Sequence, residues 1–272
     1  MNNIIKKILL LFTVLIICIP HVNAQKQKFL PLNLPDYDDA PYHFGFTITG
    51  LYSGFRVKTV DDYYNIIFQD SITELSTLGL SETVKINNIQ PKSSFGFSVG
   101  IVSNFRLNDY FDFRVIPGLS LTFRHIDLNF IRLGDDGLYH PYNELLMKEL
   151  RKDMTIECVY IDLPILLKYK GKRMRNVRPY MIGGLEYRFD VLALAPNIAA
   201  KKDDFILTKP HDLYGTFGTG FDIYMFWFKF GIELRMSYGI FNVLNENLTN
   251  SIPKDCIENI HSKHFQITFT FE

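Results

Sequence analysis

Regular alternation of apolar and polar residues is the strongest pattern in this sequence of 272 residues. Between Phe226 and Ile240 every even position is apolar or aromatic, whereas the odd positions carry charged residues, glycine and serine after Trp227. Alternate side chains of a β-strand point to opposite faces, so this segment has one apolar and one polar face. We therefore predict a strand over Phe226–Ile240.

The same alternation recurs and predicts further strands. The segments are Tyr42–Tyr52, Phe95–Phe105, Phe111–Phe123, Val159–Tyr169, Pro179–Phe189, Leu213–Ile223 and Phe265–Phe271. With Phe226–Ile240 they make eight strands. Their typical length is close to the ~9–11 residues that a tilted strand needs to cross a bilayer.

The connections between these strands alternate strictly between long and short. The short ones are Arg106–Tyr110, Lys170–Val177 and Tyr224–Trp227. Outer-membrane barrels have long extracellular loops and short periplasmic turns. The sequence therefore predicts an all-β fold, an eight-stranded antiparallel up-and-down transmembrane β-barrel with both mature termini in the periplasm.

A soluble eight-stranded barrel is the main structural alternative. It would turn its apolar faces inward and its polar faces outward. Here continuous aromatic and aliphatic faces lie opposite charged faces, which favours the inverted, membrane-embedded arrangement. The apolar stretches beyond the N-terminal region are all interrupted by Gly, Asp, Lys or Pro, so no transmembrane helix is predicted there.

The N-terminal region has the features of an export signal. Lys6 and Lys7 precede the apolar run Ile8–Ile19, and the small-residue site Val22–Ala24 follows it. We predict export to the cell outer membrane. The predicted divisions are a signal peptide over 1–24, a periplasmic N-terminal segment over 25–41 and the barrel domain over 42–272.

Composition excludes two classes of protein. The net charge is zero, whereas a nucleic-acid binder needs a basic excess to neutralise phosphates. Hydrophobic residues make up 47% of the chain, which excludes low-complexity disorder. Removal of the signal peptide leaves Cys158 and Cys256, and the sequence leaves open whether they form a disulfide.

The polar faces of the predicted strands would line the barrel lumen. Side chains fill the interior of an eight-stranded barrel, and buried charges need partners. We therefore predict an ion network and a closed barrel rather than a diffusion pore. The predicted network consists of Asp112, Arg114, Asp162, Lys168, Glu186, Arg188, Asp222, Lys229, Glu233 and Arg235, and Arg124 also falls on a polar face.

No catalytic, metal or cofactor-binding residue is predicted. Ser120, His125 and Asp127 are too close along one strand to meet as a nucleophile, base and acid. A second cluster has the residue types of a metal site, but its spacing matches no closed ligand set. That cluster consists of Asp255, Cys256, His261 and His264.

Two segments on the periplasmic side are candidates for contact with a partner. One short turn is strongly basic and could dock an acidic periplasmic protein, or could be a solvated turn held by phospholipid headgroups. Its residues are Lys170, Lys172, Arg173, Arg175, Asn176 and Arg178. The other segment, Phe29–Asp39, combines prolines with apolar residues, which suits a partner or a return onto the barrel. On the opposite side, Pro141–Asp153 is predicted as a short loop helix.

Particular sequence blocks resemble those of PorT/SprT-type outer-membrane proteins. One block is Asn33–Asp38 followed by Pro41–Phe46, and the other is Ile161–Lys170 followed by Lys172–Gly184. The resemblance implies a non-enzymatic component of the type IX secretion system, which exports proteins and supports gliding in some species. It also implies outer-membrane lipid and other secretion-system proteins of the outer membrane or periplasm as partners.

We therefore expect a non-enzymatic outer-membrane component that acts in assembly or export through periplasmic contacts. A generic small barrel for adhesion or surface protection is the alternative, and a lipid-modifying enzyme is a third hypothesis.

Overall fold

The computed structural model describes residues 31–68, 84–132, 151–194, 208–245 and 255–272. The barrel belongs to one compact unit that begins at Asn33 and ends at Glu272. The predicted signal peptide lies outside the described residues. So does most of the helix predicted over Pro141–Asp153, but its last three residues belong to a strand, which corrects that part of the prediction.

Ten strands form one sheet within the described part of the chain. They are β1 (Tyr42–Thr59), β2 (Ile67–Phe68), β3 (Val84–Arg106), β4 (Phe111–Val115), β5 (Gly118–Arg132), β6 (Arg151–Lys170), β7 (Val177–Asp190), β8 (His211–Tyr224), β9 (Lys229–Gly239) and β10 (Ile257–Phe271). Every pairing between them is antiparallel.

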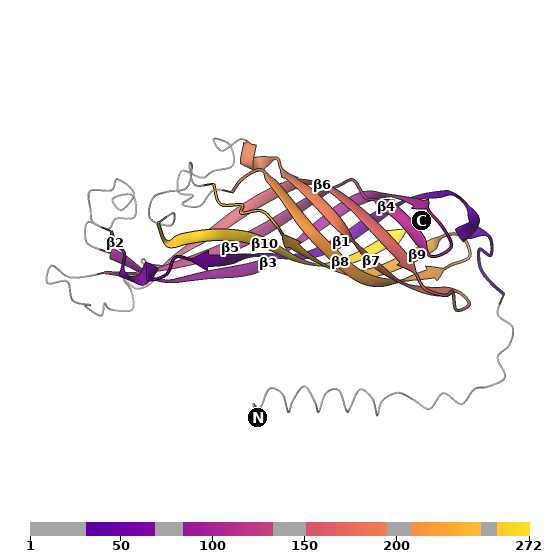
Figure 1. Ribbon diagram of the computed structural model, residues 1–272, viewed down its shortest axis with the longest axis horizontal. Helices are drawn as coiled ribbons and strands as arrows, with labels where there is room; N and C mark the ends of the chain where they lie inside the picture. Colours follow the sequence, from indigo (N-terminus) through magenta and orange to yellow (C-terminus); the bar gives the residue numbers. More distant parts are fainter. Residues whose placement is uncertain (1–30, 69–83, 133–150, 195–207, 246–254) are drawn as a thin grey trace, which may run out of the picture. The chain divides into compact units, whose positions relative to one another are not determined.

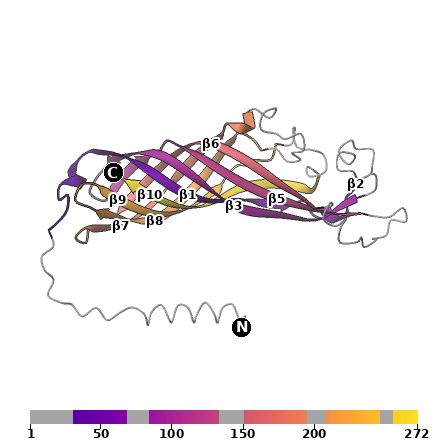
Figure 2. The same cartoon turned by 180° about the vertical axis from the view of Figure 1, so that it is seen from behind.

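The sheet closes on itself because β1 pairs with both β10 and β3. β4 and β5 occupy the same position between β3 and β6, and the two-residue β2 pairs with β3 alone. The barrel wall therefore has eight positions, which confirms the predicted eight-stranded up-and-down barrel. Figures 1 and 2 show this wall from opposite sides, with the strands running obliquely.

Two of the predicted strands have different limits in the structure. The segment Phe111–Phe123 is interrupted at Ile116 and Pro117, because proline has no backbone N–H for the ladder. The segment Phe226–Ile240 becomes a strand only at Lys229, since the preceding residues form a tight turn in which the Met225 N–H donates to the Phe228 carbonyl at 3.0 Å.

The apolar faces point outward and the polar faces point inward. On β1 the exposed side chains include Phe44, Phe46, Ile48 and Tyr52, whereas the intervening Thr47 is buried. The same arrangement holds on β9 and β10, where charged and hydroxyl side chains are buried. This confirms the inside-out pattern that distinguishes a membrane barrel from a soluble one.

Several strands continue beyond the apolar band. β1 has 18 residues, β3 has 23 and β6 has 20, which makes them much longer than predicted. In the extensions the inward side chains become apolar. Together with residues that follow β9 or precede β10, they form a core of Phe55, Ile86, Ile89, Ile126, Leu128, Val243, Leu244, Cys256, Ile257 and Ile260. We call this region the strand extension.

Short 3-10 turns occur within the described residues as η1 (Tyr37–Asp39), η2 (Tyr63–Asn65) and η3 (Leu192–Leu194). No helix in the described part of the chain is long and apolar enough to cross a membrane. Cys158 and Cys256 are free, buried thiols.

Candidate functional site: the lumen and the barrel base

All ten residues predicted for the lumen network lie inside the barrel. Their exposed fractions range from 0% to 4%. They come from strands β4 and β6 to β9, and each occupies an inward position of its strand. These residues are Asp112, Arg114, Asp162, Lys168, Glu186, Arg188, Asp222, Lys229, Glu233 and Arg235.

Arg114 joins two carboxylates across the lumen. Its guanidinium lies 3.3 Å from Glu233 and 3.0 Å from Glu272. Glu233 also contacts Arg235 at 2.7 Å and accepts a hydrogen bond from the Tyr180 hydroxyl at 2.9 Å. These contacts compensate charges that would otherwise be costly to bury.

Lysines and acids near the same end of the lumen form further pairs. Lys168 pairs with Asp222 at 2.6 Å, and its ammonium group lies 3.8 Å from the centre of the Tyr180 ring. Lys229 pairs with Glu272, the residue that also contacts Arg114. The contacts therefore connect β4, β6, β8 and β9 to the end of β10.

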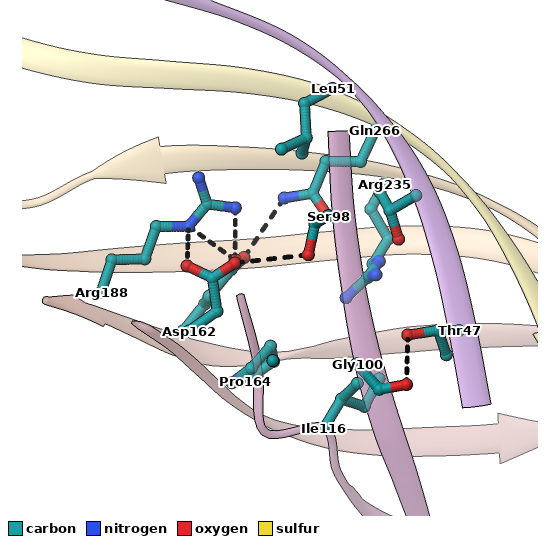
Figure 3. Close-up of a pocket in the computed structure, with 13 residues that line it drawn as sticks. Thr47, Leu51, Ser98, Gly100, Ile116, Asp162, Pro164, Arg188, Arg235 and Gln266 are labelled. Atoms are coloured by element: carbon teal, nitrogen blue, oxygen red, sulfur yellow. Dashed lines mark hydrogen bonds and ion pairs between the residues drawn. The ribbon is translucent and has the colours of Figure 1, made fainter. Parts of the chain in front are cut away.

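A second group lies around Glu186 and Arg188, neighbours on the inner face of β7. Figure 3 shows Arg188 of this group beside Asp162. The Arg188 guanidinium contacts Glu186 at 2.6 Å and Asp162 at 3.4 Å. Glu186 also accepts hydrogen bonds from Thr216, Ser237 and Gln266. The hydroxyl and amide groups thus satisfy carboxylate oxygens that the arginine does not reach.

Arg124 lies toward the strand extension and is held without an ion pair among the described residues. It donates to Ser53 at 2.9 Å and to Ser262 at 3.0 Å, and its guanidinium is 4.7 Å from the centre of the Phe55 ring. His264 lies between Arg124 and Arg188. This position beside two cations is unsuited to a metal ion.

The other candidates for chemistry are dispersed. His261 pairs with Arg56 on the outer face, whereas His264 points into the lumen. Asp127 is buried and pairs with Lys92. Among the described residues, no group of three or more His, Cys, Asp or Glu side chains could hold a metal ion.

The lumen is closely filled where these groups meet. A pocket between Thr47, Ser98, Asp162, Arg188 and Gln266 has a volume of about 10 Å³ (Figure 3). That is close to the minimum that a single water molecule needs. The described side chains around this pocket therefore leave room for about one water molecule.

Sequence reasoning missed several members of the lumen network. Glu272 and Gln266 belong to the predicted strand Phe265–Phe271 or directly follow it, and they share its polar face. The alternation therefore contained the signal for both. Lys170 was predicted as part of the exposed basic turn, but it is 3% exposed and pairs with Asp112 at 2.5 Å inside the lumen.

The turns 106–111, 170–177 and 224–229 lie at the same end as Glu272, and we call this end the barrel base. Residues 33–39, which we call the N-terminal strap, lie against it. The Asn33 N–H donates to Asn176 at 2.9 Å, and its side-chain amide donates to the Tyr224 carbonyl at 3.0 Å. The return of this segment onto the barrel was one of the two predicted possibilities.

Arg173 fixes the beginning of the strap. Its guanidinium donates to the carbonyls of Asn33 and Leu34, and it stacks 3.6 Å from the centre of the Tyr224 ring. Leu34 has a φ of 48°, in the left-handed region that favours glycine. The hydrogen bonds from Arg173 to the carbonyl oxygens of Asn33 and Leu34 hold the backbone in this bend.

Asp38 fixes the end of the strap. It accepts hydrogen bonds from Arg178 at 2.9 Å and from the Tyr224 hydroxyl at 2.5 Å. Burial alone would raise the pKa of Asp38, but the hydrogen bond from Tyr224 and the charges of Lys229, Arg178 and Lys170 outweigh it and lower the pKa.

Aromatic stacking completes the contact between strap and base. Tyr37 stacks on His43 with ring centres 4.1 Å apart, and the Lys229 ammonium lies 4.8 Å from the centre of the Tyr37 ring. Burial raises the pKa of Tyr37 to about 12. The tyrosine is therefore neutral under ordinary conditions and contacts Lys229 through its ring.

The basic turn is consequently divided between internal and exposed residues. Arg173, Asn176 and Arg178 contact the strap, and Lys170 lies in the lumen. Lys172 and Arg175 are exposed. Of the six residues predicted for partner binding, these two cations offer the most accessible charge.

A closed antiparallel barrel with an apolar outer band and a charged interior defines an outer-membrane β-barrel. The sequence matches the family described as outer membrane protein beta-barrel domain over residues 37–245. The chain belongs to this family and is an outer-membrane protein.

Three solved outer-membrane barrels are among the structures that match the chain, all at low identity. Neisserial surface protein A is 11% identical, with a TM-score of 0.38 over 85% of this chain and 99% of that chain. OprG of Pseudomonas aeruginosa is 12% identical, with a TM-score of 0.41 over 84% and 94%. The N-terminal barrel domain of P. aeruginosa OprF is 12% identical, with a TM-score of 0.25 over 83% and 97%. No curated protein matches the chain.

Proposed function

We propose that this protein is a non-enzymatic component of a protein secretion machine in the outer membrane, of the type IX kind. In organisms that glide, the same role would extend to gliding. The observation that carries the proposal is the built surface at the barrel base, where the strap is fastened to the basic turn. A filled lumen also favours action through this surface rather than transport through the barrel.

The proposed partner surface combines exposed cations with an ordered backbone. Lys172 and Arg175 are exposed on the same turn whose Arg173 and Asn176 hold the strap. Charged side chains at the edge of an interface favour association with an oppositely charged partner. The partner would be an acidic secretion-system protein of the periplasm or outer membrane, and the contact would serve assembly or export.

Deletion of the gene provides the first test. We expect cargo proteins to accumulate in the periplasm and to return to the medium when the wild-type gene is restored. Normal cargo release in the deletion strain would refute the secretion role.

Charge reversal tests the surface itself. Lys172→Glu with Arg175→Glu leaves the strap contacts in place and should reduce cargo release severalfold at unchanged protein level. Lys85→Glu with Lys209→Glu changes the charge equally on other parts of the barrel and should secrete normally. Unchanged release in the first variant would remove the turn from the proposed mechanism even if the deletion strain fails to secrete.

The strand extension favours a second candidate function, adhesion or surface protection. Its apolar core supports β-structure beyond the membrane band, on the side predicted to be extracellular. Loss of surface binding with normal secretion in the deletion strain would favour this function. A changed lipid A composition would instead favour the lipid-modifying enzyme.

A further inference from the structure

Cationic side chains follow the apolar band directly on the outer face of β1 and β10. On β1 the outward Tyr52 is followed by Arg56 and Lys58, with Gly54 between. β10 runs in the opposite direction, so Lys263 and His261, which precede the outward Phe265 in the sequence, lie beyond it on the side away from the apolar band. We call Arg56, Lys58, His261 and Lys263 the cationic row.

Strand register brings these residues together. Lys263 lies opposite Gly54, and His261 lies opposite Arg56. Cβ atoms of directly opposed residues are about 4.5–5.5 Å apart, and the next outward position along a strand is about 7 Å away. Arg56, His261 and Lys263 therefore form one continuous patch rather than isolated surface charges.

The charge of this patch is only partly compensated. Glu258 is the only acidic residue in the sequences of β1 and β10, and it pairs with Lys58 at 2.7 Å. Arg56 and Lys263 have no ion-pair partner among the described residues. Neighbouring like charges repel one another, so an anion bound between them would be stabilised.

Other exposed side chains lie beside the row. On the neighbouring strand β3, Lys92 is also exposed, but it pairs with Asp127 at 2.5 Å. Near the same edge of the band, the outward residues of β6, β7 and β9 include Glu157, Tyr187 and Tyr238. Tyr238 lies opposite Lys263, and Tyr52 lies opposite Phe265. Aromatic rings thus border the cations on the side of the membrane, as they do at lipid headgroups.

We propose that the cationic row binds the phosphate-bearing headgroup of an anionic lipid in the outer leaflet. Arginine and lysine recognise phosphate through charge-assisted hydrogen bonds. The exposed Phe265 and Ile267 continue the same face into the membrane and would contact the acyl chains. The assignment to the outer leaflet follows from the prediction that the barrel base is periplasmic, and the site is independent of the proposed secretion role.

Titration with lipid A, a phosphorylated glucosamine lipid, tests the site. The purified full-length protein in zwitterionic micelles is titrated, and bound lipid is counted by native mass spectrometry. Arg56→Ala with Lys263→Ala should weaken binding about thirtyfold, because a cation near an anionic lipid surface contributes about a factor of five. Arg56→Lys with Lys263→Arg should bind as the wild type does.

Controls separate this site from general attraction and from free phosphate. Lys85→Ala with Lys209→Ala removes two cations outside the row and should leave binding unchanged. Folding of each variant is checked by its heat-dependent electrophoretic mobility. Equal binding by the Arg56 and Lys263 double variant, equal binding of dephosphorylated lipid A, or full competition by inorganic phosphate would each overturn the proposal.

Discussion

Arg114 shows how a single side chain organises the interior of this barrel. It reaches from β4 to Glu233 on β9 and to Glu272 beyond β10, and all three side chains are buried. Removal of one partner from a buried ion pair leaves an uncompensated charge in a poorly hydrated interior. The arginine therefore has a structural role that its spacing in the sequence does not reveal.

Arg114→Met should lower the free energy of unfolding by about 3–5 kcal/mol, because it leaves two buried carboxylates short of a partner. Arg106→Met is the matched control. Arg106 pairs with the exposed Asp39 and Asp109, so its loss should cost at most about 1 kcal/mol. Urea unfolding in lipid vesicles measures both variants, and equal destabilisation would contradict the role of Arg114.

The pH dependence of the strap follows from Asp38. Its pKa is lower in the folded protein than the ordinary 3.8, so the carboxylate contributes stability above that pH. The contribution is lost as the pH falls below 3.8 toward the lowered value. Asp38→Asn should therefore loosen the strap at neutral pH.

Hydrogen exchange of residues 33–39 measures this effect. The difference between wild type and Asp38→Asn should be large at neutral pH and should diminish as the pH falls through the lowered pKa of Asp38. A difference that stays constant across this range would show that the ionised carboxylate does not hold the strap.

At this scale the sequence predicted which side chains face inward but not which of them meet. Alternation placed Arg188 and Glu233 in the lumen, because the face to which a side chain points depends only on the two-residue period of its own strand. Asp38 could not be assigned in this way, because its partners Arg178 and Tyr224 are 140 and 186 residues away in the sequence. Such contacts depend on how the barrel closes.

At the scale of elements, adjacent glycines on β7 have different surroundings. A Cβ atom at Gly184 would lie 2.2 Å from the Ile165 carbonyl oxygen on β6, whereas one at Gly183 would lie 3.8 Å from its nearest neighbour. Gly184 therefore allows the close approach of two backbones, and Gly183 does not have this role.

Gly184→Ala should destabilise the barrel by about 1–3 kcal/mol because the two strands must move apart. Gly183→Ala should be close to neutral, since its added methyl group makes an ordinary contact. Unfolding in urea compares the two proteins, and an equal loss for both would indicate a general effect of alanine rather than the predicted clash.

Strand extent was the part of the fold that alternation underestimated. The prediction for β1 ended at Tyr52, where the outward apolar residues end, yet the strand continues to Thr59. Beyond Tyr52 the apolar residue Phe55 points inward and Arg56 points outward. The pattern thus changes phase as the strand leaves the membrane band, and a search for one uninterrupted alternation stops there.

At the scale of the whole molecule, the filled lumen predicts an electrically silent barrel. Hydrated ions cannot pass a space of about 10 Å³ bordered by paired charges. The protein reconstituted in planar bilayers should show no discrete conductance steps. Stable openings of the wild type would contradict this prediction.

A double substitution on β7 tests which side chains keep the lumen closed to ions. Glu186→Ala with Arg188→Ala removes both members of a pair that borders the pocket, so it enlarges the space without leaving that pair half broken. Brief openings in this variant alone would assign the closure to the network on β7.

On the outer face of β1 the side chains change from aromatic at Tyr52 to cationic at Arg56. This boundary also determines how deeply the barrel is inserted in the bilayer. If the barrel were inserted deeper by one outward position, the Arg56 guanidinium would enter the hydrocarbon region. If it were inserted less deeply, the aromatic rings at the edge of the apolar band would be exposed to water. The strand extension therefore stands at a constant height above the lipid. A bilayer thicker than the apolar band must thin around the barrel, so the protein should partition into membranes of matching thickness.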